Sequence, residues 1–66
     1  MLVLVNGMER EDACGLTLAQ FIAQEGFDSA RVACELNGEI VARAHYGDCL
    51  LAEAGRLEIV HFVGGG

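Results

Sequence analysis

The chain contains no lysine and no proline, and its apolar runs are all far shorter than the ~20 residues that a membrane span requires. Positive charge comes from four arginines, spread one to a segment among ten carboxylates. Nucleic acids and anionic membranes attract clustered positive charge, so we expect neither as a partner. The net charge of −6 suits a basic protein partner, and equally suits simple solubility.

Cysteine is present in an odd number, as Cys14, Cys34 and Cys49. Secreted domains of this size usually carry an even set of disulfide-forming cysteines, and the first residues lack the basic region of a signal peptide. We therefore expect reduced thiols and a cytoplasmic location, with Cys34 in the core. The spacing of the cysteines from His45 and His61 does not match a zinc site, so we expect no bound metal or cofactor.

A length of 66 residues allows one domain with a small core. Such a domain cannot enclose a substrate pocket and still keep that core. The length therefore argues against a self-contained enzyme.

Five short strands and one helix are expected. The strands are predicted over residues 1–6, 8–14, 31–36, 39–41 and 57–63. Asn-Gly dipeptides at residues 6–7 and 37–38 are typical of two-residue hairpin turns and join the first two pairs. Thr17 and Gln20 form a Thr-x-x-Gln capping box at the start of the helix, and Gly26 suits the residue after its end. The apolar helix face is expected to comprise Leu18, Phe21, Ile22 and Glu25.

Residues 43–55 follow no regular pattern, and Tyr46, Leu50 and Leu51 are expected to hold a loop or a single turn against the core. Two hairpins separated by a helix suggest an α+β fold in which the helix covers one face of a mixed, five-stranded sheet. If the first and last strands pair side by side through a right-handed crossover, this fold is a β-grasp. We expect the domain to cover residues 1–63 and residues 64–66 to form a flexible tail.

The tail consists of Gly64, Gly65 and Gly66 and follows an apolar strand without a polar spacer. Chain ends are often frayed, which is the simplest explanation of such a sequence. However, a segment without side chains also fits a narrow enzyme channel that any Cβ would obstruct. In that case the reactive group is the α-carboxylate of Gly66.

Strand alternation predicts a second feature beside the tail. If the first and last strands turn Val3, Val5, Leu57 and Ile59 toward the helix, their alternate residues share the open face. This predicted docking patch consists of Leu2, Leu4, Val60 and Phe62. An apolar patch on an open sheet face marks a partner site, unless the irregular loop covers it or the residues are isolated.

The chain resembles the thiamine-biosynthesis sulfur carriers of the ThiS family. The likeness rests on the run ELNGEIV at residues 35–41, followed by Arg43, and on the ending GRLEIV-x-x-VGGG at residues 55–66. The Asn6-Gly7 turn and the helix start near Thr17 also fit. A Gly-Gly end alone is common to all ubiquitin-like carriers. Ala42 stands where the family often has proline, and His61 and Phe62 occupy variable positions.

The resemblance implies a ubiquitin-like carrier rather than an enzyme. An E1-like enzyme of the ThiF type would use ATP to adenylate Gly66, and sulfur would then displace AMP to leave a thiocarboxylate. Thiazole synthase, of the ThiG type, would accept that sulfur into the thiazole phosphate of thiamine. Three alternatives stay open: the small sulfur-carrying subunit of molybdopterin synthase, a protein modifier, and a β-grasp binding module whose tail has no chemical role. The absence of lysine excludes lysine-linked chains of this protein but not attachment to other proteins.

Overall fold

Each Asn-Gly dipeptide closes a hairpin, as the sequence predicts. The φ angles are 50° and 82° at residues 6 and 7, and 54° and 86° at residues 37 and 38. Positive φ at both central residues is characteristic of the type I′ turn, whose twist matches that of the strands it joins. These angles come from a computed structural model, which describes residues 2–62.

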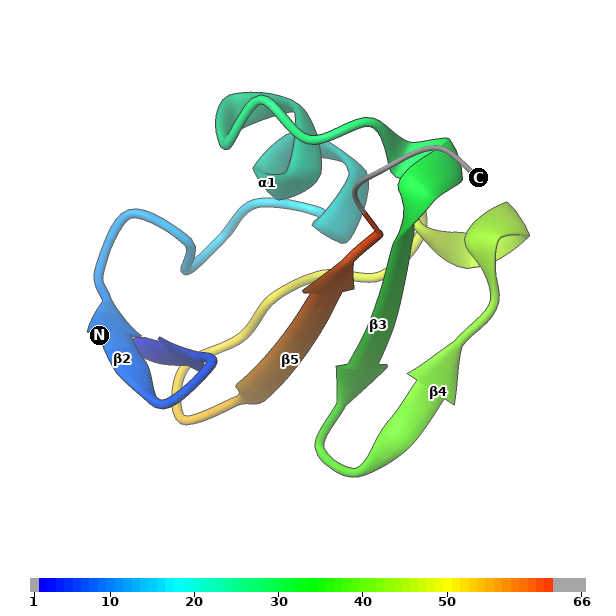
Figure 1. Cartoon of the computed structure of the whole chain (residues 1–66). Helices are drawn as coiled ribbons and strands as arrows, with labels where there is room; N and C mark the ends of the chain where they lie inside the picture. Colours follow the sequence, from blue (N-terminus) through cyan, green and yellow to red (C-terminus); the bar gives the residue numbers. More distant parts are fainter. Residues whose placement is uncertain (1, 63–66) are drawn as a thin grey trace.

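The described chain contains five strands, one α-helix and two short 3₁₀ turns (Figure 1). They are β1 (Val3–Val5), β2 (Met8–Arg10), α1 (Leu18–Gln24), η1 (Ser29–Arg31), β3 (Val32–Leu36), β4 (Glu39–Val41), η2 (Arg43–His45) and β5 (Arg56–His61). The 3₁₀ turn η1 was not predicted, whereas η2 lies in the segment where a loop or a single turn was expected. Met1 and Val63, at the ends of two predicted strands, lie outside the described residues.

The predicted second strand, over residues 8–14, is too long. β2 ends at Arg10, and the chain continues in two turns. In these turns the N–H of Cys14 donates to the carbonyl of Glu11, and the N–H of Leu16 donates to the carbonyl of Ala13. Arg10 is paired with Val3, the first residue of β1, and the backbone N–H groups that follow bond within the turns, so the ladder does not continue.

The sheet has the strand order β2-β1-β5-β3-β4. β1 and β5 are parallel, and the other three neighbouring pairs are antiparallel. The first and last strands therefore lie side by side within a mixed sheet (Figure 1). β2, the hairpin partner of β1, lies outside β1, and the β3–β4 hairpin lies on the other side of β5. This arrangement confirms the predicted β-grasp.

Helix α1 has the predicted caps at both ends. The hydroxyl of Thr17 accepts from the N–H of Gln20 at 3.1 Å, and the amide oxygen of Gln20 accepts from the N–H of Thr17 at 2.9 Å. At the other end Gly26 has φ 79°, and the N–H of Phe27 donates to the carbonyl of Ile22 at 3.1 Å. This is the long-range bond of a Schellman motif, which ends the helix and aims the chain at Phe27.

One face of the sheet packs against α1 to form the core. The predicted inward residues of β1 and β5 are all buried, as are Val32 and Cys34 of β3, whereas Leu36 is half-buried. The helix contributes Leu18, Phe21 and Ile22. Full burial of one such apolar side chain stabilises a protein by about 1.5–3 kcal/mol, so these few residues dominate the stability of a 66-residue domain.

The irregular segment packs on the core through two of the three residues expected. Tyr46 and Leu51 are buried, but Leu50 is 59% exposed, so its prediction as a core residue is wrong. Leu50 forms a single antiparallel bridge with Thr17, which gives this part of the loop an extended, alternating geometry. Because neighbouring residues then point to opposite sides, Leu51 enters the core and Leu50 faces solvent.

The side chain of Asn6 extends the pairing of β5 beyond the end of β1. Its amide nitrogen donates to the carbonyl of Ile59 at 3.1 Å, and its amide oxygen accepts from the N–H of Ile59 at 2.7 Å. Asn37 acts similarly at the start of β5, where its side-chain oxygen accepts from the N–H of Arg56 at 2.9 Å. Both hairpin turns are therefore bonded to the central strand.

Arg10 joins β2 to the end of α1. Its guanidinium forms paired bonds of 2.8–2.9 Å with the carboxylates of Glu25 and Asp12, and its Cζ lies 5.1 Å from the ring centre of Phe21. Glu25 thus forms an ion pair instead of adding to the apolar helix face.

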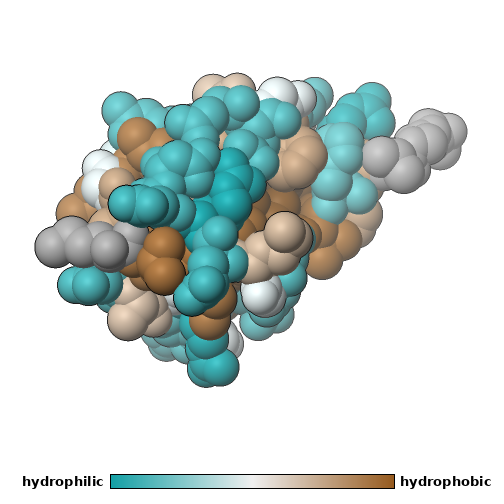
Figure 2. Space-filling view, turned by 90° about the vertical axis from the view of Figure 1, so that its left-hand side faces the viewer, coloured by the Kyte–Doolittle hydropathy of each residue, from teal (hydrophilic) through white to brown (hydrophobic). Residues whose placement is uncertain are grey.

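Figure 2, which looks onto the side that carries β2, shows mainly hydrophilic residues with separate apolar ones between them.

We predict that Asn6→Ala lowers the free energy of unfolding by roughly 2–4 kcal/mol, because it removes two hydrogen bonds and places alanine at positive φ. Asn6→Gly keeps the allowed turn and loses only the amide, so its effect should be about half as large. Urea denaturation followed by circular dichroism measures both. A free energy for Asn6→Ala within about 0.5 kcal/mol of the wild-type value would contradict this role.

The Arg10 contacts predict an acid-sensitive contribution to stability. The guanidinium lowers the pKa of both Glu25 and Asp12, chiefly through its hydrogen bonds. Carboxylates with a lowered folded-state pKa stabilise the fold above their ordinary pKa of about 4, and that stability is lost as the pH falls through the folded-state values. Arg10→Met should therefore be less stable than wild type at pH 7, and the difference should shrink on acidification.

Chemical denaturation between pH 7 and pH 3 tests this pH dependence. The matched control is Arg56→Met, which removes the same charge from an arginine that forms no ion pair within residues 2–62. An equal pH dependence in the two variants would show that net charge, and not the Arg10 contacts, determines the acid response.

Candidate functional site

The C-terminal end of β5 leads to the predicted tail. Gly64, Gly65 and Gly66 lie outside the described residues, and Phe62 is the last residue that the structure describes. β5 is bonded to β1 on one side and β3 on the other, so the chain approaches the tail from the centre of the sheet. The last described residue, Phe62, therefore follows a strand that is paired on both edges.

The predicted docking patch is divided between the two ends of the open face. Val60 and Phe62 are 56% and 57% exposed and lie next to the tail. Leu4 is opposite Arg56, at the start of β5, and Leu2 comes two residues before Leu4, at the end of the sheet away from Phe62. Four residues of strand, or about 13 Å, separate Arg56 from Val60. The patch was predicted from strand alternation alone. Alternation assigns residues to a face of the sheet but does not determine how neighbouring strands are aligned along their length.

The half of the patch near the tail also contains Ala33 and Ile40, which were not predicted from the sequence. Val60 pairs with Ala33 on β3, and Ile40 on β4, which is 81% exposed, pairs with Glu35. A shallow hollow of about 140 Å³ lies between them, lined by Ala33, Cys34, Glu35, Ile40, Glu58 and Val60. The position of Ile40 could have been predicted from the two-residue Asn37-Gly38 turn, because this turn fixes the register of β3 against β4.

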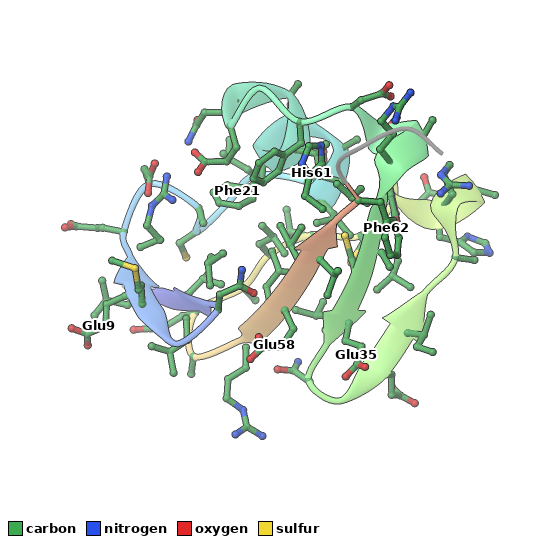
Figure 3. All side chains as sticks on the ribbon, viewed as in Figure 1. Glu9, Phe21, Glu35, Glu58, His61 and Phe62 are labelled. Carbon is green, nitrogen blue, oxygen red and sulfur yellow. The ribbon has the colours of Figure 1, made fainter. Side chains whose placement is uncertain are left out.

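Two like charges face each other across this hollow. Glu35 of β3 is directly opposite Glu58 of β5. Within residues 2–62 neither carboxylate takes part in an ion pair, and like charges in this position destabilise a sheet. Figure 3 shows Glu35 and Glu58 on the part of the sheet away from α1. We define the docking face as Ala33, Ile40, Val60 and Phe62, flanked by these two glutamates.

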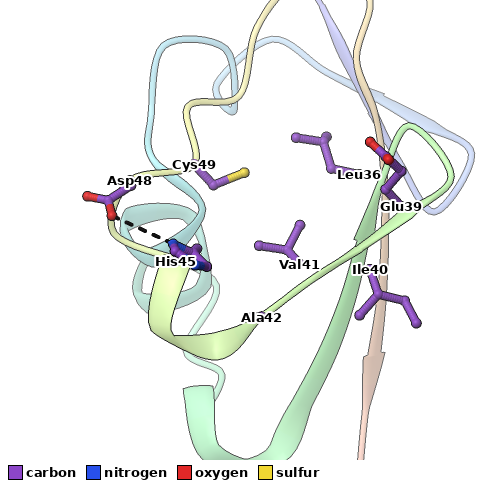
Figure 4. A pocket seen from close by; sticks show the side chains of 8 residues that line it. All are labelled: Leu36, Glu39, Ile40, Val41, Ala42, His45, Asp48 and Cys49. Atoms are coloured by element: carbon purple, nitrogen blue, oxygen red, sulfur yellow. Dashed lines mark ion pairs between the residues drawn. The ribbon is translucent and has the colours of Figure 1, made fainter.

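A second hollow, of about 380 Å³, lies between β4 and the loop that follows it (Figure 4). On its rim the Nδ1 of His45 lies 4.0 Å from the Oδ2 of Asp48. The half-buried Cys49 also lines this hollow. Within residues 2–62 no three or more His, Cys, Asp or Glu side chains are arranged so that they could hold a metal ion. This hollow therefore does not form a metal centre from the described residues.

The three cysteines of the described chain form no disulfide with one another. Cys34 is buried under α1, and this burial raises the pKa of its thiol. A raised pKa leaves little thiolate at neutral pH, which makes Cys34 a packing residue. Among residues 2–62 no helix is both long enough and apolar enough to cross a bilayer.

The family comparison matches almost the entire chain. The model of the ThiS family matches residues 3–66, which include all three terminal glycines. The crystal structure of the thiamine-biosynthesis protein ThiS from Geobacter metallireducens superposes with a TM-score of 0.78, at 28% identity over the full length of both chains. An NMR structure of a thiamine-biosynthesis protein from the same organism gives the same score and identity, over 88% of that chain.

Two curated relatives are also similar over the whole of this chain. They are named thiazole synthase, come from Paramagnetospirillum magneticum and Magnetococcus marinus, and are each 38% identical over 66 residues. The chain spans about a fifth of the length of these relatives. Because the family match covers residues 3–66 and the fold agrees with that of solved members, the chain belongs to the ThiS family.

Proposed function

We propose that this chain is a sulfur carrier for the synthesis of the thiazole ring of thiamine. The observation that carries the proposal is the ThiS family match, which extends through the three terminal glycines to residue 66. The similarity to two proteins named thiazole synthase supports the same pathway. In this role the chain is a substrate of other enzymes and is not itself a catalyst.

The proposed chemistry takes place at the α-carboxylate of Gly66. An E1-like enzyme of the ThiF type transfers AMP from ATP to this carboxylate and releases pyrophosphate. The acyl adenylate contains a good leaving group, so a sulfur nucleophile displaces AMP and leaves a thiocarboxylate. Thiazole synthase of the ThiG type then takes up the sulfur. The glycines at 64, 65 and 66 allow the tail to enter a narrow channel, because they have no Cβ.

The docking face gives the partner enzymes a surface to bind. Its exposed apolar side chains offer buried area, and Glu35 and Glu58 favour a partner with basic groups at the matching positions. Only the tail-proximal half of the originally predicted patch belongs to it, since Leu2 and Leu4 lie at the other end of the sheet. A partner on this face lies next to Phe62 and thus next to the start of the tail.

The carrier role predicts a specific mass change. The 66-residue chain, incubated with a ThiF-type enzyme, ATP and a sulfur donor, should gain the mass of one sulfur minus one oxygen, located at Gly66 by fragmentation. A chain that ends at Gly64 is the matched control, and it should keep its fold and gain nothing. Conversion by a molybdopterin-type activating enzyme alone would instead assign the chain to that pathway, and covalent adducts on lysines of other proteins would indicate a modifier.

The docking face predicts that a charge at Phe62 weakens recognition. Phe62→Asp should raise the KM of the activating enzyme for this chain more than about fivefold, since aromatic residues at the centre of an interface commonly contribute over 1 kcal/mol. Leu50→Asp is the matched control, because Leu50 is equally exposed but lies near the start of α1. Equal KM values for the two variants would remove Phe62 from the interface. Thermal unfolding checks that both variants stay folded.

A further inference from the structure

The point at which the chain leaves β5 is held by two contacts. The N–H of Phe62 donates to the carbonyl of Arg31 at 2.7 Å. One residue earlier, the ring of His61 stacks on the ring of Phe27, with centroids 4.9 Å apart and an angle of 22° between the ring planes. Figure 3 shows His61 on the α1 side of β5. Both contacts come from residues 27–31, the connection between α1 and β3.

Phe27 is itself held by the end of the helix. The left-handed conformation of Gly26 and the bond from the N–H of Phe27 to Ile22 place its ring directly after α1. Phe27 is half-buried and packs against the core cluster. The ring that supports His61 is therefore anchored to the most buried part of the domain.

The carbonyl of Arg31 is held in a similar way. The carboxylate of Asp28 accepts from the N–H of Ala30 at 2.9 Å and caps η1. From the other side, the guanidinium of Arg43 donates to the carbonyl of Ser29 at 2.8 Å. These bonds fix the turn that receives the N–H of Phe62.

We propose that His61 is a positioning residue that holds the direction of the chain at Phe62, the residue from which the sequence continues into residues 63–66. The effect of His61 on delivery of the carboxylate rests on the proposed carrier function. The contacts of His61 themselves do not depend on that function. His61 does not touch the reacting carboxylate. It acts through its stack on Phe27, which together with the Phe62–Arg31 bond fixes the start of the tail relative to the docking face.

The short length of the tail makes its starting direction important. Four residues separate Phe62 from the end of Gly66, and a chain of that length spans at most about 14 Å. A partner bound to the docking face can therefore receive the carboxylate only if its active centre lies within that distance. If the start of the tail moves, productive delivery becomes less frequent while docking is unaffected.

The test compares His61→Ala, which removes the stack, with His61→Phe, which restores an aromatic ring. In the adenylation assay at saturating ATP, His61→Ala should lower kcat by about threefold to tenfold with little change in KM for the carrier, and His61→Phe should recover most of the loss. Phe27→Ala should have a similar effect, and the double variant should be no worse than the single variants. Assays are run well below the melting temperature of every variant.

A second measurement needs no partner enzyme. The ¹⁵N relaxation of the Phe62 amide should give an order parameter typical of rigid backbone, roughly 0.85, in the wild type and a lower value in His61→Ala. A loss of thermal stability in His61→Ala with unchanged kcat, KM and Phe62 order would overturn the proposal, because the stack would then be purely structural. If the wild-type chain is not adenylated, the carrier function fails, and the order of Phe62 alone decides whether His61 holds the start of the tail.

Discussion

The pairing of β5 on both of its edges is the constraint on which the structure depends. This strand comes last in the chain but lies at the centre of the sheet, so the fold is complete only when it inserts between β1 and β3. The side chains of Asn6 and Asn37 add hydrogen bonds to its backbone beyond the ends of the neighbouring strands, at Ile59 and Arg56. Residues that close the hairpins therefore also hold the central strand.

This central position links the fold to the proposed function. The strand that is paired on both edges leads to Phe62, and its open side carries part of the docking face. The side toward α1 contributes Leu57 and Ile59 to the core and His61 to the stack on Phe27. Glu35 and Glu58 are directly opposite each other on the open side, a like-charge pairing that does not stabilise the sheet.

The sequence by itself determined those features that depend on neighbouring residues. Positive φ is tolerated by asparagine and glycine, so both Asn-Gly turns were predictable, and so were the capping box at Thr17 and the end of the helix at Gly26. Alternation correctly assigned Val3 and Ile59 to the core. The family was recognisable from its middle hairpin and its glycine ending, and the family comparison confirms that recognition.

Only the tertiary structure decided features that depend on register or on distant contacts. Alternation assigns Leu4 and Val60 to the same face but not to the same end of it, because the parallel register of β1 against β5 is set by long-range packing. The exposure of Leu50 follows from its bridge to Thr17, far away in sequence. The stack of His61 on Phe27 likewise joins residues 34 positions apart, a contact that exists only once β5 has inserted.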